Sequence, residues 1–305
     1  MERKVIVIVG PTCSGKTKVG ISLAERLNTE IISADSRQLY KMITIGTAKP
    51  THDELQKIKH HFIDFLEPDE DFNVSRFEAD SLKIIDELIS KGKIPIVVGG
   101  SGLYIKALTE GIFNSVDVDD GYRDELKKLR EKFGNEYLYD ELIKVDPQSA
   151  SGMLPQNWKR VMRALEVFHL TGEPIWKFQE NYKRETDYEF ILFGLNWDRK
   201  QLYRNIENRV DTMIKEGLVD EIKNILSLGY SKSLNSLNTV GYKEIISYFE
   251  NEITLERAVE LIKRNTRRYA KRQMTWFRKT KNVNWVQCNE NDNPEKLISA
   301  FLKKV

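Results

Sequence analysis

A glycine-rich turn between an apolar run and a helix-like segment constrains this chain more than any other feature. The β-branched run at residues 5–9 leads directly into a G-x-x-x-x-G-K-T pattern. Gly10 and Gly15 allow the backbone to turn so that successive N–H groups point inward at phosphate oxygens. Lys16 adds a positive charge, and Thr17 offers a hydroxyl to Mg²⁺ where a helix begins. The pattern predicts a phosphate loop that binds a polyphosphate or a diphosphate.

The rest of the first hundred residues alternates between strand and helix patterns. Strands are expected at residues 5–9, 30–34 and 94–98, and helices at 16–27, at 77–91 behind the candidate N-cap Ser75, and from about 103. Such alternation is typical of an α/β fold with a parallel sheet and helices on both faces. Ligands of these folds bind at the carboxyl ends of the strands. Asp35 and Ser101 follow the second and third strands, so we expect them to share one crevice with the phosphate loop.

Strand patterns disappear between residues 114 and 188. Helices are expected there at 121–132, 136–144 and 158–171, and the last is stopped by Gly172 and Pro174. One further strand is expected at 190–195, with helices from Arg199 to the end of the chain. The sequence therefore predicts a P-loop NTPase-like α/β core formed by residues 1–113 and 189–305, which carries an all-helical insertion at 114–188.

The strongest concentration of charge lies near the end of the chain. Residues 257–281 hold ten Lys or Arg side chains against a single acidic residue, Glu260, although the net charge of the whole chain is only +2. Tyr269, Trp276 and Phe277 are interleaved with these cations. Basic side chains displace counterions from nucleic-acid phosphates, and aromatic rings can stack on bases. This segment favours a polynucleotide partner over an ordinary solvated helix face.

The composition indicates a protein of the reducing cytoplasm without a membrane segment. The chain holds only two cysteines, Cys13 and Cys288, which argues against a disulfide framework. No apolar run approaches the ~18 residues that span a membrane. The first strand begins directly after residue 4, which leaves no room for a signal peptide.

Two features separate nucleotide hydrolysis from other phosphate chemistry. Asp35 ends the second strand, where a carboxylate can accept a proton or hold a nucleophile near a transferred group. No apolar run ends in a convincing second aspartate for Mg²⁺, and Asp198 is a weak candidate. A diphosphate that acts as substrate or leaving group is therefore favoured over hydrolysis of a triphosphate.

His60 and His61 lack companions at metal-ligand spacing, so structural roles are expected for them.

At this point the chain resembles the tRNA dimethylallyltransferases, also called tRNA isopentenyltransferases, over essentially its whole length. The segments that carry the resemblance are GPTCSGKT (10–17), SADSRQLY (33–40), IGTAKPT (45–51), HHFID (60–64), VVGGSGLYI (97–105), KRVMRALEVFHLTG (159–172), RVDTMIKEGLVDEI (209–222), VGYKE (240–244) and RRYAKRQMTWFR (267–278). The chain departs from the usual motifs with Ser101 in place of Thr and Cys13 in place of Ala. Ser101 keeps the hydroxyl.

The resemblance implies transfer of a five-carbon dimethylallyl group from its diphosphate to the exocyclic N6 of the adenine just 3′ of a tRNA anticodon. It implies Mg²⁺ as cofactor, and tRNA and dimethylallyl diphosphate as partners; a monomer is the default expectation. Diphosphate would be bound by Gly10, Pro11, Thr12, Cys13, Ser14, Gly15, Lys16, Thr17 and Arg209, with Thr17 also on Mg²⁺. The catalytic residues would be Asp35, which accepts the N6 proton, Ser101 near the reacting centre, and Lys16 on the departing diphosphate. The anticodon loop would be contacted by Asp35, Ser36, Arg37, Gln38, Ser101, Arg123, Lys159, Arg160, Val161, Met162 and Arg163, with the insertion holding the anticodon stem-loop.

Three other functions remain open on the sequence. An enzyme that prenylates free adenosine nucleotides shares the phosphate loop and Asp35, although it needs neither the insertion nor the basic segment. A small-molecule P-loop kinase would consume ATP and needs an arginine-bearing lid. A non-enzymatic RNA-binding module would have no need for Lys16.

Overall fold

The chain divides into two compact units, and each is described by itself. The computed structural model describes residues 3–113, 116–182, 184, 186–290 and 292–303. One unit, here called the core unit, comprises Met1–Thr109 and Thr186–Val305, and the other, the insertion unit, is Glu110–Glu185. The boundaries expected from the sequence, at 114 and 188, lie a few residues further along the chain.

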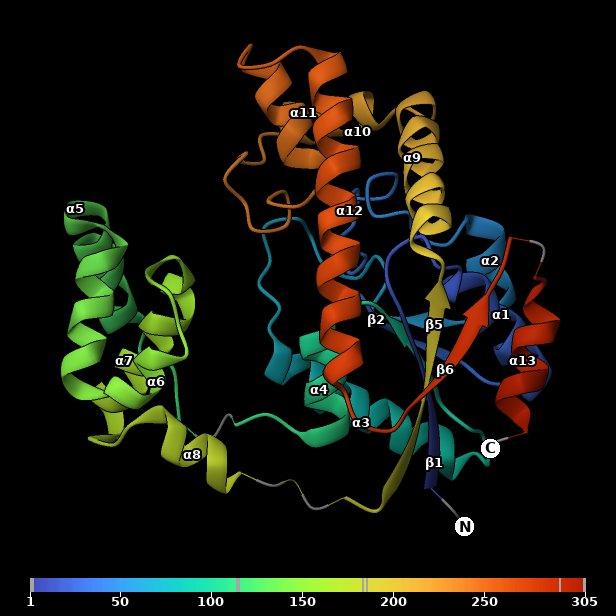
Figure 1. Ribbon diagram of the computed structural model, residues 1–305, viewed down its shortest axis with the longest axis horizontal. Coiled ribbons are helices and arrows are strands. Elements are labelled where there is room, and N and C mark those ends of the chain that lie inside the picture. The colour runs from blue at the N-terminus through green and yellow to red at the C-terminus, as the bar shows by residue number, and fades with distance from the viewer. Residues whose placement is uncertain (1–2, 114–115, 183, 185, 291, 304–305) are drawn as a thin grey trace. The chain divides into compact units, whose positions relative to one another are not determined.

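A six-stranded parallel sheet forms the centre of the core unit, in the order β3-β2-β4-β1-β5-β6 (Figure 1). The strands are β1 (Arg3–Val9), β2 (Ile31–Ala34), β3 (His60–His61), β4 (Ile96–Gly99), β5 (Tyr188–Trp197) and β6 (Val283–Cys288). The predicted α/β class with a parallel sheet is confirmed. The central strand is β1, so the phosphate loop that follows it opens from the middle of the sheet.

Helices cover both faces of this sheet. In the core unit they are α1 (Lys16–Leu27), α2 (His52–Lys57), α3 (Val74–Ser90), α4 (Gly102–Glu110), α9 (Arg199–Lys215), α10 (Leu218–Ser227), α11 (Tyr242–Phe249), α12 (Leu255–Lys279) and α13 (Pro294–Leu302). Helices α1 and α13 lie together on one face, and α3, α4 and α12 pack on the other. In Figure 1 the arrow of β5 leads directly into α9 at the carboxyl edge of the sheet.

The apolar pattern of β1 explains why the sheet is covered twice. Successive side chains of a strand point to opposite faces. Val5, Val7 and Val9 belong to the core beside α3 and α4, whereas Ile6 and Ile8 belong to the core beside α1 and α13. All five are fully buried. A continuous apolar strand of this kind is typical of parallel sheets covered by helices on both sides.

The insertion unit is helical throughout its described part and has its own apolar core. Its helices are α5 (Asp120–Val145), α6 (Pro147–Ser151), a 3₁₀ turn (Pro155–Asn157), α7 (Trp158–Thr171) and α8 (Ile175–Asn181). Gly134 has φ of 89° inside α5, which breaks the helix there into the two predicted helices. Leu138, Leu142 and Val161 are among the fully buried side chains.

Two expectations about the core unit were wrong. Helix α3 begins one turn earlier than expected, because the side chain of Asn73, and not that of Ser75, accepts the capping hydrogen bond from the Arg76 N–H at 2.9 Å. Strand β6 interrupts the segment after Arg199 that was expected to be helical. It lies at the edge of the sheet and is only partly buried, so its apolar signal is weak.

Among the described residues, no helix combines the length and the apolar character needed to cross a membrane.

The close approach of β2 and β4 yields a test of stability. A Cβ at Gly99 would lie 2.2 Å from the carbonyl oxygen of its partner Ala34, a contact with rigid backbone. We expect Gly99→Ala to lower the free energy of unfolding by about 1–3 kcal/mol, because the strands must separate. Denaturant unfolding followed by circular dichroism measures the change. Gly152→Ala is the control, since its nearest backbone atom would lie 3.7 Å away; an equal loss in both variants would contradict the argument.

Candidate active site

Three strand ends meet at the carboxyl edge of the sheet, as the sequence predicts. Strands β2, β4 and β1 are neighbours, so the residues that follow them lie side by side. They line a cavity of about 270 Å³ that includes residues 12–18 of the phosphate loop, Asp35, and Gly99 with Gly100. Ser101 is tied to the same edge, since its N–H donates to the Ala34 carbonyl at 3.2 Å.

The phosphate loop presents backbone donors and one buried hydroxyl to this cavity. Gly15 precedes α1 with φ of 85°, and no side chain caps the helix start, so its first N–H groups face the cavity. Lys16 Nζ donates to the Pro11 carbonyl at 2.6 Å. Within the described part of the chain, Ser14 Oγ is buried without a hydrogen-bond partner. A buried orphan hydroxyl is costly unless a ligand satisfies it, which is expected of a group that binds an anion or a metal ion.

When the cavity contains protein atoms alone, the Lys16 ammonium loses its proton more easily than that of an exposed lysine. Burial lowers the pKa of Lys16 to about 8; the Asp35 carboxylate opposes this shift, and the Arg209 guanidinium adds to it. An incoming anion would favour the charged ammonium.

Asp35 forms a tight turn at the end of β2. Its Oδ1 accepts hydrogen bonds from the Arg37 N–H at 2.8 Å and from the Gln38 N–H at 3.4 Å. Among the described residues Oδ1 is the partnered oxygen, so Oδ2 is available to a substrate. Ser101 Oγ accepts from the Ser36 N–H at 3.1 Å and thereby holds the same turn. Asp35 thus holds the turn with one carboxylate oxygen and leaves the other for a substrate.

A second cavity, of about 310 Å³, adjoins the first. It has apolar walls from α9 and α12, which include Val210 and Ile262, and cations that include Arg37, Lys243 and Arg272. The residues that line both cavities are Thr12, Cys13, Asp35, Thr47, Arg209 and Tyr269. Asp35 therefore lies where the two cavities meet.

Arg209 and Tyr269 reach this junction from two different helices. Arg209 on α9 contacts Cys13 Sγ at 3.6 Å and the Thr47 carbonyl at 3.5 Å. Burial raises the pKa of the Tyr269 hydroxyl, and the Asp35 carboxylate raises it further, so this hydroxyl stays protonated. Tyr269, one of the aromatic residues that the sequence places in the basic segment, lines both cavities.

Gln273 is a site residue that the sequence reasoning missed. It lies on α12 and is only 7 % exposed. Its Oε1 accepts from the Thr12 N–H at 2.8 Å, and its Nε2 donates to the Gly100 carbonyl at 3.0 Å. One amide therefore ties the phosphate loop to the turn that carries Ser101. Helical spacing from Tyr269 and Phe277 places Gln273 on the inward face, a signal that the surrounding basic residues concealed.

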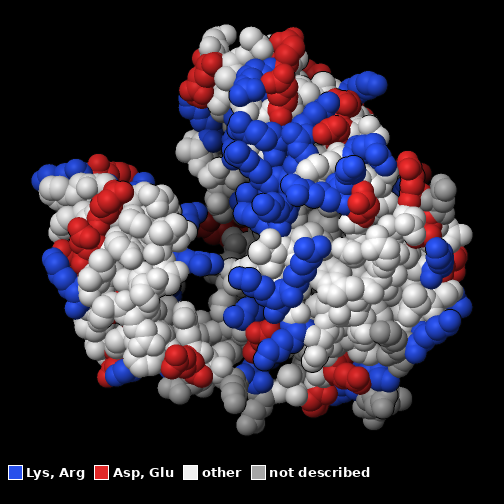
Figure 2. All heavy atoms as spheres, viewed as in Figure 1, with Lys and Arg blue, Asp and Glu red and all other residues white. Residues whose placement is uncertain are grey.

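The outward face of α12 carries the cations that the sequence singled out. Figure 2 shows Lys and Arg gathered over this helix. A shallow depression on it is lined by Arg268, Lys271, Arg272, Thr275, Trp276 and Lys279. An exposed stripe of cations with an aromatic ring suits a nucleic-acid backbone.

The predicted RNA-contacting residues of the insertion unit differ in exposure. Lys159 and Arg160 are exposed. Arg163 and Arg123 both pair with the fully buried carboxylate of Glu166, and Arg123 Nη2 lies 3.0 Å from it. Val161 and Met162 pack in the apolar core of the unit, so the prediction that these two side chains touch RNA conflicts with their burial.

Two secondary candidates have structural roles. The Asp198 carboxylate caps α9 through the N–H groups of Lys200 and Gln201 at 2.9 and 3.1 Å. His60 and His61 form the edge strand β3, and His61 contacts Glu30 at 2.8 Å. No group of three or more His, Cys, Asp or Glu side chains within the described ranges could hold a metal ion.

The fold and this site define a P-loop-like α/β protein with a phosphate cavity and a second, adjoining cavity. The chain belongs to the IPP transferase family, whose pattern it matches over residues 38–280. A tRNA dimethylallyltransferase of Acetivibrio thermocellus is 49 % identical over 96 % of this chain and 95 % of its own length. One from Alkaliphilus metalliredigens is 45 % identical over 100 % and 98 %. The family is one of prenyltransferases.

Solved structures show the same fold. The full-length tRNA isopentenylpyrophosphate transferase from Bacillus halodurans aligns with a TM-score of 0.73 and 41 % identity, covering 99 % of this chain and 95 % of that one. A eukaryotic dimethylallyltransferase acting on tRNA aligns with a TM-score of 0.81 and 27 % identity, covering 99 % and 80 %.

The lowered pKa of Lys16 predicts how anion binding depends on pH. Above pH 8 the free protein loses the ammonium charge, so we expect the affinity for inorganic diphosphate to fall about tenfold between pH 7 and pH 9. Isothermal titration calorimetry over this range measures it. Lys16→Arg is the control, because arginine stays charged throughout. A parallel fall in the variant and the wild type would show that Lys16 is not the titrating group.

Proposed function

We propose that this protein transfers a dimethylallyl group from dimethylallyl diphosphate to the exocyclic N6 of the adenine on the 3′ side of a tRNA anticodon. The observation that carries the proposal is the meeting of two cavities at Asp35, one of them lined by the phosphate loop. Two substrates can approach a shared base from two directions in this arrangement. The names of the relatives support the same reaction.

The phosphate-loop cavity is where we place the diphosphate. The free N–H groups at the start of α1, the Lys16 ammonium and Arg209 offer positive charge to it. Leaving diphosphate gains charge as the C–O bond breaks, and preformed donors stabilise that charge. These groups would therefore stabilise the departing diphosphate.

Mg²⁺ fits the same cavity. Phosphate-loop proteins hold this ion by the Ser or Thr hydroxyl of the loop together with substrate phosphates. Thr17 lines the cavity at the first turn of α1, and Ser14 contributes its unpartnered buried hydroxyl. These two hydroxyls would hold the ion, which when bound supplies charge neutralisation to the diphosphate.

Asp35 is the proposed base. The aromatic amine of adenine is a weak nucleophile, so its proton must leave as the new bond forms. The N6–C bond forms, the allylic C–O bond breaks, the proton passes to Asp35 and diphosphate departs. Ser101 holds the Asp35 turn through the Ser36 N–H. Among the described residues nothing accepts from the Ser101 hydroxyl, so its hydrogen can bind the acceptor.

The adenine must leave its stack in the anticodon loop to enter the second cavity. Flipping a base costs a few kcal/mol, which contacts elsewhere must offset. Arg37, Lys243 and Arg272 at this cavity, with the exposed cations of α12, are placed to bind the RNA phosphates. Lys159 and Arg160 of the insertion unit remain predicted contacts of the RNA. A monomeric state and a cytoplasmic location also remain predictions.

The direct test combines the protein with Mg²⁺, dimethylallyl diphosphate and unmodified tRNA, followed by mass spectrometry of the nucleosides. A dimethylallyl-sized mass gain on the adenosine 3′ of the anticodon is expected. A gain on free AMP or ADP, and none on tRNA, would assign the protein to nucleotide-directed prenyltransferases. Consumption of ATP without any prenylation would favour a kinase.

The base assignment makes a separate prediction. Asp35→Asn keeps the oxygen that accepts from the Arg37 N–H but cannot take up a proton. We expect kcat to fall on the order of 10²- to 10⁴-fold, while the Kd for tRNA stays near that of the wild type. Single-turnover kinetics and filter binding measure the two quantities. Weakened tRNA binding with an intact rate would exclude Asp35 as the base.

A further inference from the structure

The loop formed by residues 43–49, here called the 43–49 loop, borders both cavities. Thr47 and Ala48 line the first cavity, and Gly46 and Thr47 line the second. The loop leads from the Asp35 turn toward α2. Its conformation sets the direction of the Thr47 and Ala48 carbonyl groups.

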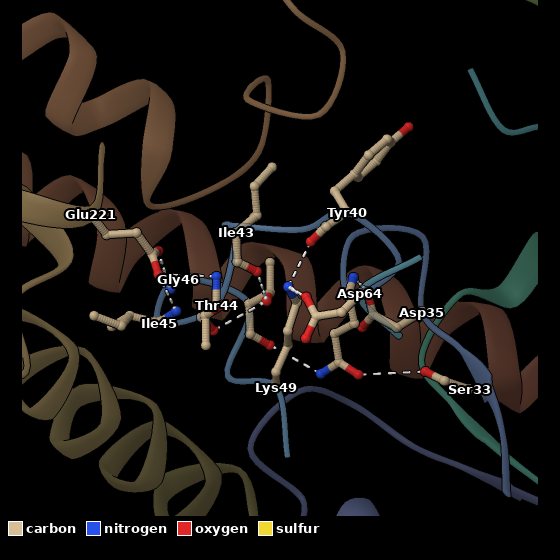
Figure 3. A network of polar contacts seen from close by, with 12 residues as sticks. Ser33, Asp35, Tyr40, Ile43, Thr44, Ile45, Gly46, Lys49, Asp64 and Glu221 are labelled. Atoms are coloured by element: carbon tan, nitrogen blue, oxygen red, sulfur yellow. Dashed lines mark hydrogen bonds and ion pairs between the residues drawn. The ribbon is translucent and has the colours of Figure 1, made fainter. Parts of the chain in front are cut away.

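A single carboxylate outside the cavities holds one side of this loop. Glu221 on α10 accepts hydrogen bonds from three consecutive backbone N–H groups, those of Thr44 at 3.0 Å, Ile45 at 2.7 Å and Gly46 at 3.3 Å (Figure 3). Charge-assisted hydrogen bonds of this kind are stronger than neutral ones. Glu221 itself lines neither cavity.

Tyr242 completes the clamp from α11. Its hydroxyl donates to the Glu221 carboxylate. Burial and the nearby Glu221 carboxylate raise the pKa of Tyr242, so the hydroxyl keeps its proton. A Cβ at Gly46 would lie 2.3 Å from the Tyr242 ring, which shows how closely the ring covers the loop.

The other side of the loop connects to Asp35. The Thr47 and Ala48 carbonyls accept from Gln38 Nε2 at 3.1 and 3.2 Å. The Gln38 backbone N–H donates in turn to Asp35 Oδ1 at 3.4 Å. The Thr47 carbonyl also faces Arg209 Nη2 at 3.5 Å. The loop thus connects Glu221 to Asp35, the proposed base, and to Arg209, a proposed diphosphate ligand.

Lys49 fixes the end of the loop independently. Its side chain is 1 % exposed, donates to the Tyr40 carbonyl at 2.6 Å and pairs with Asp64 (Figure 3). With Lys49 anchored there, the part that Glu221 controls is the stretch from Thr44 to Ala48. A change at Glu221 therefore acts on the carbonyls that hold Gln38 and Arg209.

We propose that Glu221, supported by Tyr242, is a positioning residue that sets the Asp35 carboxylate at the junction of the two cavities by holding the 43–49 loop. This inference rests on the proposed prenyl transfer. A base must lie within hydrogen-bond reach of the proton that it takes, and misplacement by about 1 Å can cost 10²-fold in rate. Glu221 lines neither cavity, so we expect its effect to fall on the chemical step and not on substrate binding.

Glu221→Gln is the test variant. Glutamine has the same shape but puts an NH₂ group where a carboxylate oxygen accepted, so it opposes one of the backbone donors. We expect a fall in kcat of about 10- to 100-fold, with the Kd for tRNA unchanged and the protein still folded under the assay conditions. Asp220→Asn, an exposed acid-to-amide change on the same helix, is the matched control and should keep the wild-type rate.

A double variant distinguishes positioning from general weakening of the fold. If Glu221 acts through Asp35, adding Glu221→Gln to Asp35→Asn should lower the residual single-turnover rate no further. A multiplicative loss in the double variant would overturn the proposal. So would a wild-type rate in Glu221→Gln, or equal losses of rate, tRNA affinity and stability.

If Glu221→Gln does not fold, Tyr242→Phe tests the positioning role in its place. It removes the hydroxyl and keeps the ring on Gly46, and a smaller fall in kcat at unchanged tRNA affinity is expected. A wild-type rate in Tyr242→Phe would then overturn the proposal. Absence of prenylated tRNA with the wild-type protein would instead reject the proposed function, which keeps the two failures apart.

Discussion

The parallel hydrogen bonds that join β2 to β4 and β4 to β1 bring three strand ends to one edge of the sheet. The phosphate loop, Asp35 and Ser101 each follow one of these strands, so their proximity is a consequence of the pairing. Gly99 permits the closest of these contacts, since the Ala34 backbone leaves no room for a side chain beside it. The phosphate loop and Asp35 take their positions in the first cavity from this edge, in agreement with the ligand-binding rule of open α/β sheets.

The groups that face the substrates and the groups that hold them in place come from different parts of the chain. Lys16, Asp35 and Ser101 follow strands β1, β2 and β4, whereas Trp197, Glu221 and Gln273 come from much later segments. Trp197 donates to the Ser14 carbonyl at 3.0 Å, and Gln273 joins Thr12 to Gly100. Helix α12 therefore has two functions, since it presents cations outward and an amide inward. A rigid second layer of this kind keeps reactive groups in productive geometry.

Local patterns predicted the site better than they predicted its support. The phosphate loop, Asp35 and α1 could be predicted because each depends on a few adjacent residues, and their spacing has one main physical explanation. Strand β6 and Gln273 could not, because their roles arise from pairing and packing with distant segments. Ser75 and Asn73 are both good helix caps, and only the packing of Val74 and Phe77 on the core selects the earlier start. The burial of Val161 and Met162 follows from α7 packing within the insertion unit, which the positive charges beside them concealed.

The position of β1 at the centre of the sheet has a consequence for biosynthesis. This strand is made first, yet its neighbours β4 and β5 lie at residues 96–99 and 188–197. One edge of this strand, which includes the apolar run of residues 5–9, therefore stays unpaired until the whole insertion unit has left the ribosome. Contacts so distant along the chain form slowly, and unpaired apolar strands invite association with other chains. The nascent chain therefore keeps at least one edge of β1 open to association with other chains until β5 has been synthesised.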